Sequence, residues 1–226
     1  MTAIPSSKRK VRRARRRHLP AAERKSHLLD VGVALVRDRG WQHLSIANVA
    51  RGAGVSRQLV HQYFGDLEQL GLDLAARFFD EVYEVATTAI AHHLDDQAAV
   101  LRYMAEKFLV GLREDRRAYG DFAAGHWQHS KLQPPLREMY GRHRKSLIQL
   151  WSRYFERVNG LSPQRANVVA TLQFDSFRGF GGMVDAGELE SEEAIALLIQ
   201  IVGAIIERLG GTTLRPRAGF DPGGDT

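Results

Sequence analysis

Residues 44–64 constrain the fold more than any other stretch of the chain. Ser45 precedes the run from Ile46 to Arg51, and its hydroxyl can accept a hydrogen bond from an amide of a first helical turn. Ser56 offers the same cap to the run that follows it. Between the two runs, Gly54 suits the left-handed backbone of a sharp turn. The pattern predicts two short helices, 46–51 and 57–63, joined by a tight turn.

The second of these helices has a polar outward face. Small Ala50 allows the two helices to cross closely, and the apolar residues fall at spacings that can bury one face of each helix. Polar side chains on the other face can hydrogen-bond base edges or phosphates, and a helix of this size fits the major groove. An ordinary helical hairpin with a solvated face is the alternative. The candidate DNA contacts of this unit are Ser45, Ser56, Arg57, Gln58, His61, Gln62 and Tyr63.

The segment from Gly40 to Ser56, with Tyr63-Phe64 and Glu68-Gln69-Leu70 after it, resembles the TetR family of bacterial transcriptional regulators over residues 24–72. The resemblance implies an all-α protein with an N-terminal three-helix DNA-binding head. It also implies a larger helical body that binds a small effector and dimerises, with repression released by the effector. The chain has His61 where family members usually have tyrosine, and Leu67 where they usually have lysine.

Basic residues are concentrated before the head. The net charge of the chain is +6, whereas residues 8–17 alone hold eight Lys or Arg and no acid, so the remainder is slightly acidic. We expect an arm that follows phosphates or enters the minor groove. A solvated tail is the alternative, and a secretory leader is disfavoured because no apolar run follows Pro20. The candidate arm contacts are Arg12, Arg13, Arg15, Arg16 and Arg17.

Apolar periodicity and capping residues predict helices along the remaining chain. Gly40 should end a first helix, Asp66 and Asp96 should cap later ones, and Pro134-Pro135 should break the chain. The expected helices are 21–39, 67–93, 97–112, 116–129, 136–158, 163–179 and 191–209, with glycines 179, 181 and 182 loosening the sixth. The expected domains are a disordered arm (1–19), a helix-turn-helix head (20–66), an effector-binding and dimerisation body (67–210) and a disordered tail (211–226).

The last helix is apolar on almost every side between Ala194 and Ile206. A helix of this kind must be covered on every side, so we expect a partner subunit to pack on the last two helices in a two-fold homodimer. No apolar run reaches the roughly 18 residues of a membrane span. We expect a cytoplasmic protein that does not enter the membrane.

An effector pocket in the body should be lined by aromatic side chains with a few polar groups. The candidate ligand contacts are Tyr103, Phe122, His126, Trp127, Trp151, Phe174 and Phe177. Metal binding is disfavoured because His92-His93 and the pair His126 and His129 lack a third ligand nearby, and no cofactor is expected. Catalysis is disfavoured because the carboxylates are scattered and the chain has no cysteine.

The sequence therefore predicts a regulator that binds a pseudo-palindromic DNA operator as a dimer and represses until a small apolar or aromatic effector releases it. An architectural or activating DNA-binding protein without a small-molecule ligand remains the alternative.

Overall fold

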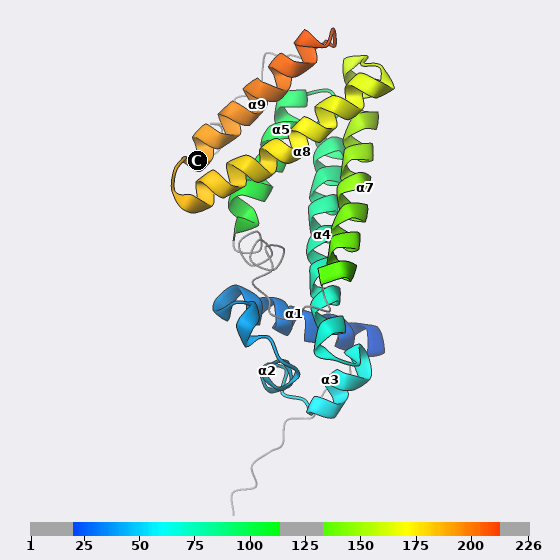
Figure 1. Cartoon of the computed structure of the whole chain (residues 1–226), viewed down its shortest axis with the longest axis vertical. Helices are drawn as coiled ribbons and strands as arrows, with labels where there is room; N and C mark the ends of the chain where they lie inside the picture. The colour runs from blue at the N-terminus through cyan, green and yellow to red at the C-terminus, as the bar shows by residue number, and fades with distance from the viewer. Residues whose placement is uncertain (1–19, 114–132, 213–226) are drawn as a thin grey trace, which may run out of the picture.

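The computed structural model describes residues 20–113 and 133–212, and within these ranges the chain forms helices and turns without a strand. Figure 1 shows a small head of α1, α2 and α3 at one end and a larger helical body at the other. Helix α4 runs from the head into the body, where α7 lies beside it and α8 and α9 cross the far end. The predicted all-α class is confirmed.

The head is built on three helices with the predicted bounds, to within one residue. Helix α1 spans Ala21–Arg39 and ends at Gly40, whose φ of 79° favours glycine. After the short 3₁₀ turn η1 (Trp41–His43), α2 spans Ile46–Gly52 and α3 spans Arg57–Phe64. Trp41 and Leu44 are buried, which confirms that they fill the core of the head.

Two glycines let α1 approach its neighbours closely. A Cβ atom at Gly52 would lie 2.7 Å from Cγ1 of Val31, so glycine permits the contact between α1 and α2. A Cβ atom at Gly32 would lie 3.1 Å from a methyl carbon of Leu74, which is fully buried in α4. Close packing of α1 on α2 and on α4 therefore requires glycine at positions 52 and 32.

Helix α4 (Leu67–His93) is 27 residues long and joins head to body. Asp66 caps it by accepting a 2.8 Å hydrogen bond from the amide of Gln69, as the sequence predicts. Lys25 and Asp73 form an ion pair of 2.7 Å, and Asp30 and Arg77 form one of 2.6 Å. These ion pairs hold α1 against the first turns of α4, so we expect this part of α4 to move together with the head.

The body contains α5 (Gln97–Ala105), the π-helical stretch η2 (Glu106–Gly111), α7 (Gln133–Asn159), α8 (Pro163–Ala186) and α9 (Ser191–Arg208). Asp96 caps α5, as predicted, but the expected continuous α-helix to residue 112 is wrong because its last part is π-helical. The expected helix at 116–129 lies outside the described residues.

Two predicted helix breaks are also wrong. Pro134 and Pro135 lie inside the first turn of α7, where a missing amide N–H costs no intrahelical hydrogen bond. Glycines 179, 181 and 182 do not end α8, which continues to Ala186. Glycine lowers helix stability by only about 1 kcal/mol a residue, and the packing of α8 on α7 and α9 outweighs that cost.

The end of α9 is tied back to α7. Asn159 is 2% exposed, and it donates to the backbone oxygen of Thr212 at 2.7 Å while its own carbonyl accepts from the Thr212 amide at 3.1 Å. Hydrogen bonds to backbone atoms thus hold Gly211 and Thr212 near the end of α7, and the rest of the predicted tail lies outside the described residues. In the described ranges, no helix has both the length and the apolar composition that a membrane span needs.

Candidate functional site

Both serines of the central motif cap the helices that they precede. Ser45 Oγ accepts from the amide of Asn48 at 3.1 Å, and Ser56 Oγ accepts from the amide of Leu59 at 3.2 Å. Ser56 is exposed and Ser45 is half-buried. Each hydroxyl retains its own proton, so Ser56 can cap α3 and still donate to a phosphate at the helix start.

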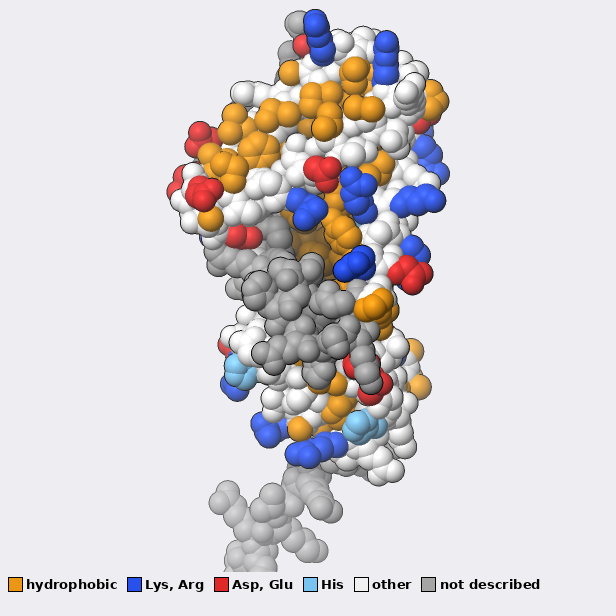
Figure 2. Space-filling view, in the orientation of Figure 1, with side chains coloured by type: hydrophobic (Ala, Val, Ile, Leu, Met, Phe, Trp, Pro, Cys, Tyr) orange, Lys and Arg blue, Asp and Glu red, His pale blue; other side chains and the backbone are white. Residues whose placement is uncertain are grey.

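Helix α3, which we call the recognition helix, presents an open polar face. Arg57, Gln58 and Gln62 are exposed, and none of them makes a hydrogen bond or ion pair with another described residue. On the opposite face, Val60 and Phe64 are buried in the head. Figure 2 shows basic and histidine side chains at the end of the molecule where Figure 1 places α2 and α3. Tyr63 is half-buried and packs on the core, so only part of it is accessible.

His61 is exposed but partly engaged. Its Nδ1 atom lies 2.6 Å from the carbonyl oxygen of Gly65. A carbonyl can only accept, so Nδ1 carries the proton and donates. The outward Nε2 atom of a neutral ring is then an acceptor, which suits the amino group of adenine or cytosine. His61 therefore combines a structural bond at the end of α3 with one free polar atom.

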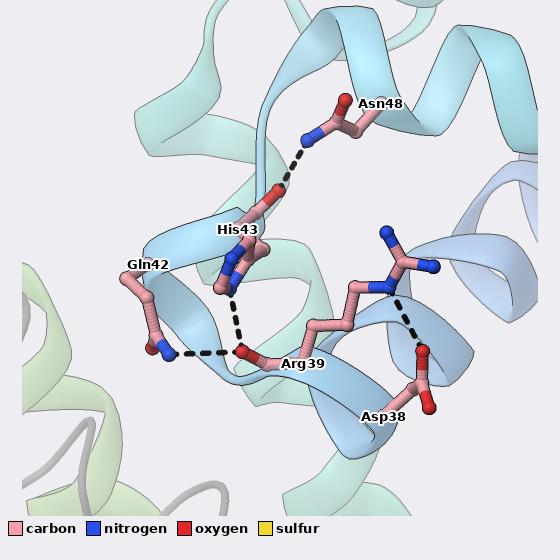
Figure 3. A network of polar contacts seen from close by, with 5 residues as sticks. All are labelled: Asp38, Arg39, Gln42, His43 and Asn48. Atoms are coloured by element: carbon pink, nitrogen blue, oxygen red, sulfur yellow. Dashed lines mark hydrogen bonds and ion pairs between the residues drawn. The ribbon is translucent and has the colours of Figure 1, made fainter.

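A backbone carbonyl at the end of α1 organises the entry to α2. The oxygen of Arg39 accepts from Nε2 of Gln42 at 2.9 Å and from Nδ1 of His43 at 2.6 Å. Asn48 in α2 donates in turn to the oxygen of His43 at 2.8 Å (Figure 3). This network fixes the position of α2 relative to α1, and thereby the position of the recognition helix within the head.

Sequence reasoning missed two features of this region. Arg51 is exposed on α2 and donates to Oδ1 of Asn48 at 3.0 Å, which holds its guanidinium at the surface of the helix-turn-helix. The signal for it was present, because a basic residue in the last turn of the first helix lies close to the turn. The Arg39 carbonyl network has no sequence signal, since it joins side chains to backbone atoms. The arm arginines 12, 13, 15, 16 and 17 lie outside the described residues.

The four described ligand candidates lie in different surroundings. Trp151 is 3% exposed and contacts Tyr154 and Phe155 in an aromatic core of α7. Phe177 is buried edge-on against Phe108, with ring centroids 5.6 Å apart.

Tyr103 and Phe174 are half-buried. Tyr103 lies between His93 and the ammonium group of Lys107, and Phe174 lies beside Tyr140. The structure thus does not bring the four candidates together in one site. Phe122, His126 and Trp127 lie outside the described residues.

Comparison with known proteins identifies the head. Residues 28–74 match the sequence model for bacterial regulatory proteins of the tetR family. This range holds the capped turn and the recognition helix described above. Residues 28–74 thus carry the similarity to this family. No curated protein matches the chain significantly.

Solved structures share the fold of this chain at low sequence identity. A transcriptional regulator from a Rhodococcus species is 17% identical with a TM-score of 0.69, over 84% of this chain and 99% of that one. A TetR-family regulator from Streptomyces coelicolor is 19% identical with a TM-score of 0.56, over 82% and 99%. The TetR-family repressor AlkX from a Dietzia species, implicated in the biodegradation of n-alkanes, is 16% identical with a TM-score of 0.55, over 81% and 97%.

A groove lies between α1 of the head and α4. It has a volume of about 520 Å³. The Asp30–Arg77 ion pair crosses this region, and Phe78 forms part of its apolar wall. The lining residues are Asp30, Val33, Ala34, Arg37, Arg77, Phe78, Asp80, Glu81 and Glu84.

Histidine pairs form no metal site in the part of the chain that the structure describes. There, no three histidine or acidic side chains are grouped in a way that could hold a metal ion. The rings of His92 and His93 are 6.3 Å apart, and His93 packs near Tyr103. His126 and His129 lie outside the described residues.

Proposed function

We propose that this chain is a dimeric, ligand-responsive transcriptional repressor that binds a pseudo-palindromic operator with α3 and is released by a small molecule bound in the body. The observation that carries the proposal is the recognition helix itself. Arg57, Gln58 and Gln62 extend from one face of a rigidly capped helix with no described partner to satisfy them. Arginine pairs with guanine and glutamine pairs with adenine in the major groove.

Operator recognition also needs a fixed head. Helix α3 has eight residues, about 12 Å of helix, which is enough to reach three to five base pairs from one side. The Arg39 carbonyl network and the α1–α4 ion pairs hold it relative to α4. The arginines of residues 8–17 would add contacts to phosphates or the minor groove beside the site.

The proposed dimer uses one face of α8 and α9. Val168, Leu172 and Met183 in α8 and Ile201 in α9 are each 39–44% exposed, which is unusual for large apolar side chains. Figure 2 shows apolar side chains running across this part of the body. A second copy in two-fold contact would cover them and place the two recognition helices on successive major grooves.

Two glycines of α8 fit this interpretation. A Cβ atom at Gly179 or Gly182 would meet no atom within 4 Å, so packing within one chain gives no reason for glycine there. Each glycine nevertheless costs helix stability. Close approach of a partner helix would offset that cost.

The experiment is retention of genomic DNA fragments by the purified full-length protein at physiological salt, followed by sequencing and by sedimentation of the complex. Enrichment of a palindrome bound by an even number of chains is expected. Retention without sequence preference would overturn the operator-binding function and favour an architectural protein, whose body serves only assembly.

A further inference from the structure

An aromatic cluster joins three helices of the body at mid-length. Phe79 of α4 stacks on His143 of α7 with ring centroids 4.6 Å apart and 22° between the planes. Tyr140 of α7 lies 6.2 Å from Phe79 and 6.5 Å from Phe174 of α8. We call Phe79, Tyr140, His143 and Phe174 the α4–α7–α8 cluster. No residue of this cluster is fully buried, so the cluster is not simply the centre of the core.

Two arginines lie on this cluster. The guanidinium carbon of Arg144 is 5.5 Å from the centroid of Phe174, and that of Arg178 is 5.7 Å from the centroid of Tyr140. Arg144 also pairs with Asp175 at 3.4 Å. Arg178 is exposed and has no acidic partner among the described residues. Within the described residues, the rim of the cluster therefore carries one positive charge without an acidic partner, over an aromatic surface.

A polar atom of the cluster also lacks a partner. Among the described residues, none donates to or accepts from the buried hydroxyl of Tyr140. Buried polar atoms are nearly always hydrogen-bonded in folded proteins, so this hydroxyl is available to donate to a ligand. Figure 2 shows a hollow with an apolar floor and Lys or Arg side chains on its rim where α8 passes α4 in Figure 1.

We propose that the α4–α7–α8 cluster binds the effector and selects amphipathic organic anions, with a carboxylate or sulfonate held by Arg178 and an apolar part against Phe79 and Phe174. The Tyr140 hydroxyl donates to the anion. This proposal rests on the proposed function in assigning the ligand to regulation. The class excludes organic cations, which Arg178 repels.

His143 adds no positive charge to the site. Burial lowers the pKa of His143 to about 4, so its ring is neutral at physiological pH and acts as an aromatic surface.

The cluster is connected to the groove between α1 and α4 by adjacent residues of α4. Phe79 belongs to the cluster, whereas Phe78 lines the groove between α1 and α4, and the two ring centroids are 5.8 Å apart. A ligand that displaces Phe79 must shift or rotate this part of α4, and the head is fastened to the turn before it by the Asp30–Arg77 ion pair. Differential affinity for two positions of α4 would thus couple the site to DNA release.

The test is calorimetric titration of the full-length protein, without DNA, with two matched probe pairs: 2-naphthoate and 2-naphthamide, and octanoate and octanamide. We expect at least one anion to bind about tenfold more tightly than its neutral amide. Arg178→Gln should weaken that anion about tenfold and leave the amide unchanged. Arg157→Gln, an exposed arginine about 20 Å along α7 from Arg144, is the control and should change neither.

Equal binding of anion and amide, failure of both anions to bind at millimolar concentration, or an unchanged affinity in Arg178→Gln would each overturn the site. Circular dichroism of each variant checks the fold, and Tyr140→Phe provides a second variant with an intact cluster. DNA release is measured separately. An anion that binds with the expected preference but leaves DNA bound supports the site and contradicts its regulatory role, so the two proposals fail in different assays.

Discussion

Phe79 of α4 and His143 of α7 form a stacked pair, with ring centroids 4.6 Å apart and an angle of 22° between the rings. The pair joins the helix that leaves the head to the longest helix that packs beside it in the body. Desolvation in this contact lowers the pKa of His143 from 6.5 to about 4. The stack is therefore made with a neutral imidazole, and protonation of that ring opposes folding.

This pKa shift predicts acid sensitivity. Between about pH 6.5 and 4, unfolded His143 binds a proton and folded His143 does not, so stability falls as the pH falls through that window and levels off below it. The ring is partly exposed, so we expect His143 to contribute about 1–2 kcal/mol of this loss rather than the full shift. Urea unfolding at pH 7.5 and 4.5 measures it. His143→Phe should lose that much less stability between the two pH values, and parallel losses in both proteins would contradict the assignment.

Two glycine-to-alanine substitutions, one in α1 and one in α7, should change the free energy of unfolding in opposite directions. Gly32→Ala brings a Cβ within 3.1 Å of a Leu74 methyl that is fully buried and has little room to move. We expect a loss of about 1 kcal/mol of unfolding free energy, because the strain exceeds the gain in helix propensity. Gly141→Ala in α7 meets no atom within 4 Å and should gain about 0.5–1 kcal/mol. Chemical unfolding of both variants compares them, and a gain in Gly32→Ala would show that Leu74 can yield.

The helices were predictable where local chemistry decides them. Ser45, Ser56, Asp66 and Asp96 each cap the helix that the sequence assigns to them, because a cap needs only a side chain and an amide a few residues away. The errors have two causes. Pro134 and Pro135 lie in the first turn of α7, where a missing amide N–H costs no hydrogen bond, whereas α8 continues through its glycines because it packs on α7 and α9.

The candidate sites also differ in how far the sequence could identify their residues. The open face of α3 follows from helical periodicity, so Arg57, Gln58 and Gln62 were identified from the sequence. The α4–α7–α8 cluster was not, apart from Phe174, because Phe79 lies in α4 whereas Tyr140 and His143 lie in α7, which does not follow α4 directly in the chain. Apolar spacing marks each of these helices as amphipathic, but it does not say which aromatic side chains meet.

The recognition helix predicts a loss of sequence discrimination on truncation. Arg57→Ala or Gln58→Ala removes side chains that make no described contact within the protein, so the fold should be unchanged. If they contact bases, each variant should lose about 1–3 kcal/mol of preference for operator over random DNA. Fluorescence anisotropy with both DNAs measures the two affinities. An equal loss on both sequences would instead make these residues phosphate contacts.

Removal of the arm should change the salt dependence of DNA binding. Removal of residues 1–17 takes away the eight basic residues of positions 8–17. Affinity should fall for operator and random DNA alike. The negative slope of the logarithm of the binding constant against the logarithm of the salt concentration should become less steep by about 0.9 for each phosphate that the protein no longer neutralises. Titrations at four salt concentrations provide the slope. An unchanged slope would remove the arm from the interface.

The exposed apolar face of α8 and α9 predicts that one charge can separate the dimer. Leu172 is 44% exposed in the middle of α8, so Leu172→Asp should scarcely disturb the single chain. In a two-fold interface the carboxylate would be buried without a partner, beside its symmetry copy or nearby apolar groups. Desolvation of that charge costs several kcal/mol, so the dimer dissociation constant should rise about 100-fold or more.

Val110 supplies the matched control. It is 53% exposed, more than Leu172, but it lies in η2 rather than on the α8–α9 face. Val110→Asp should therefore leave the dimer intact if position, and not surface hydrophobicity in general, decides the effect. Sedimentation equilibrium of both variants gives the comparison. Because each half-site contact is weak without its partner, Leu172→Asp should also lose operator affinity while retaining binding to random DNA through the arm. Dissociation by Val110→Asp, or a stable Leu172→Asp dimer, would place the interface elsewhere.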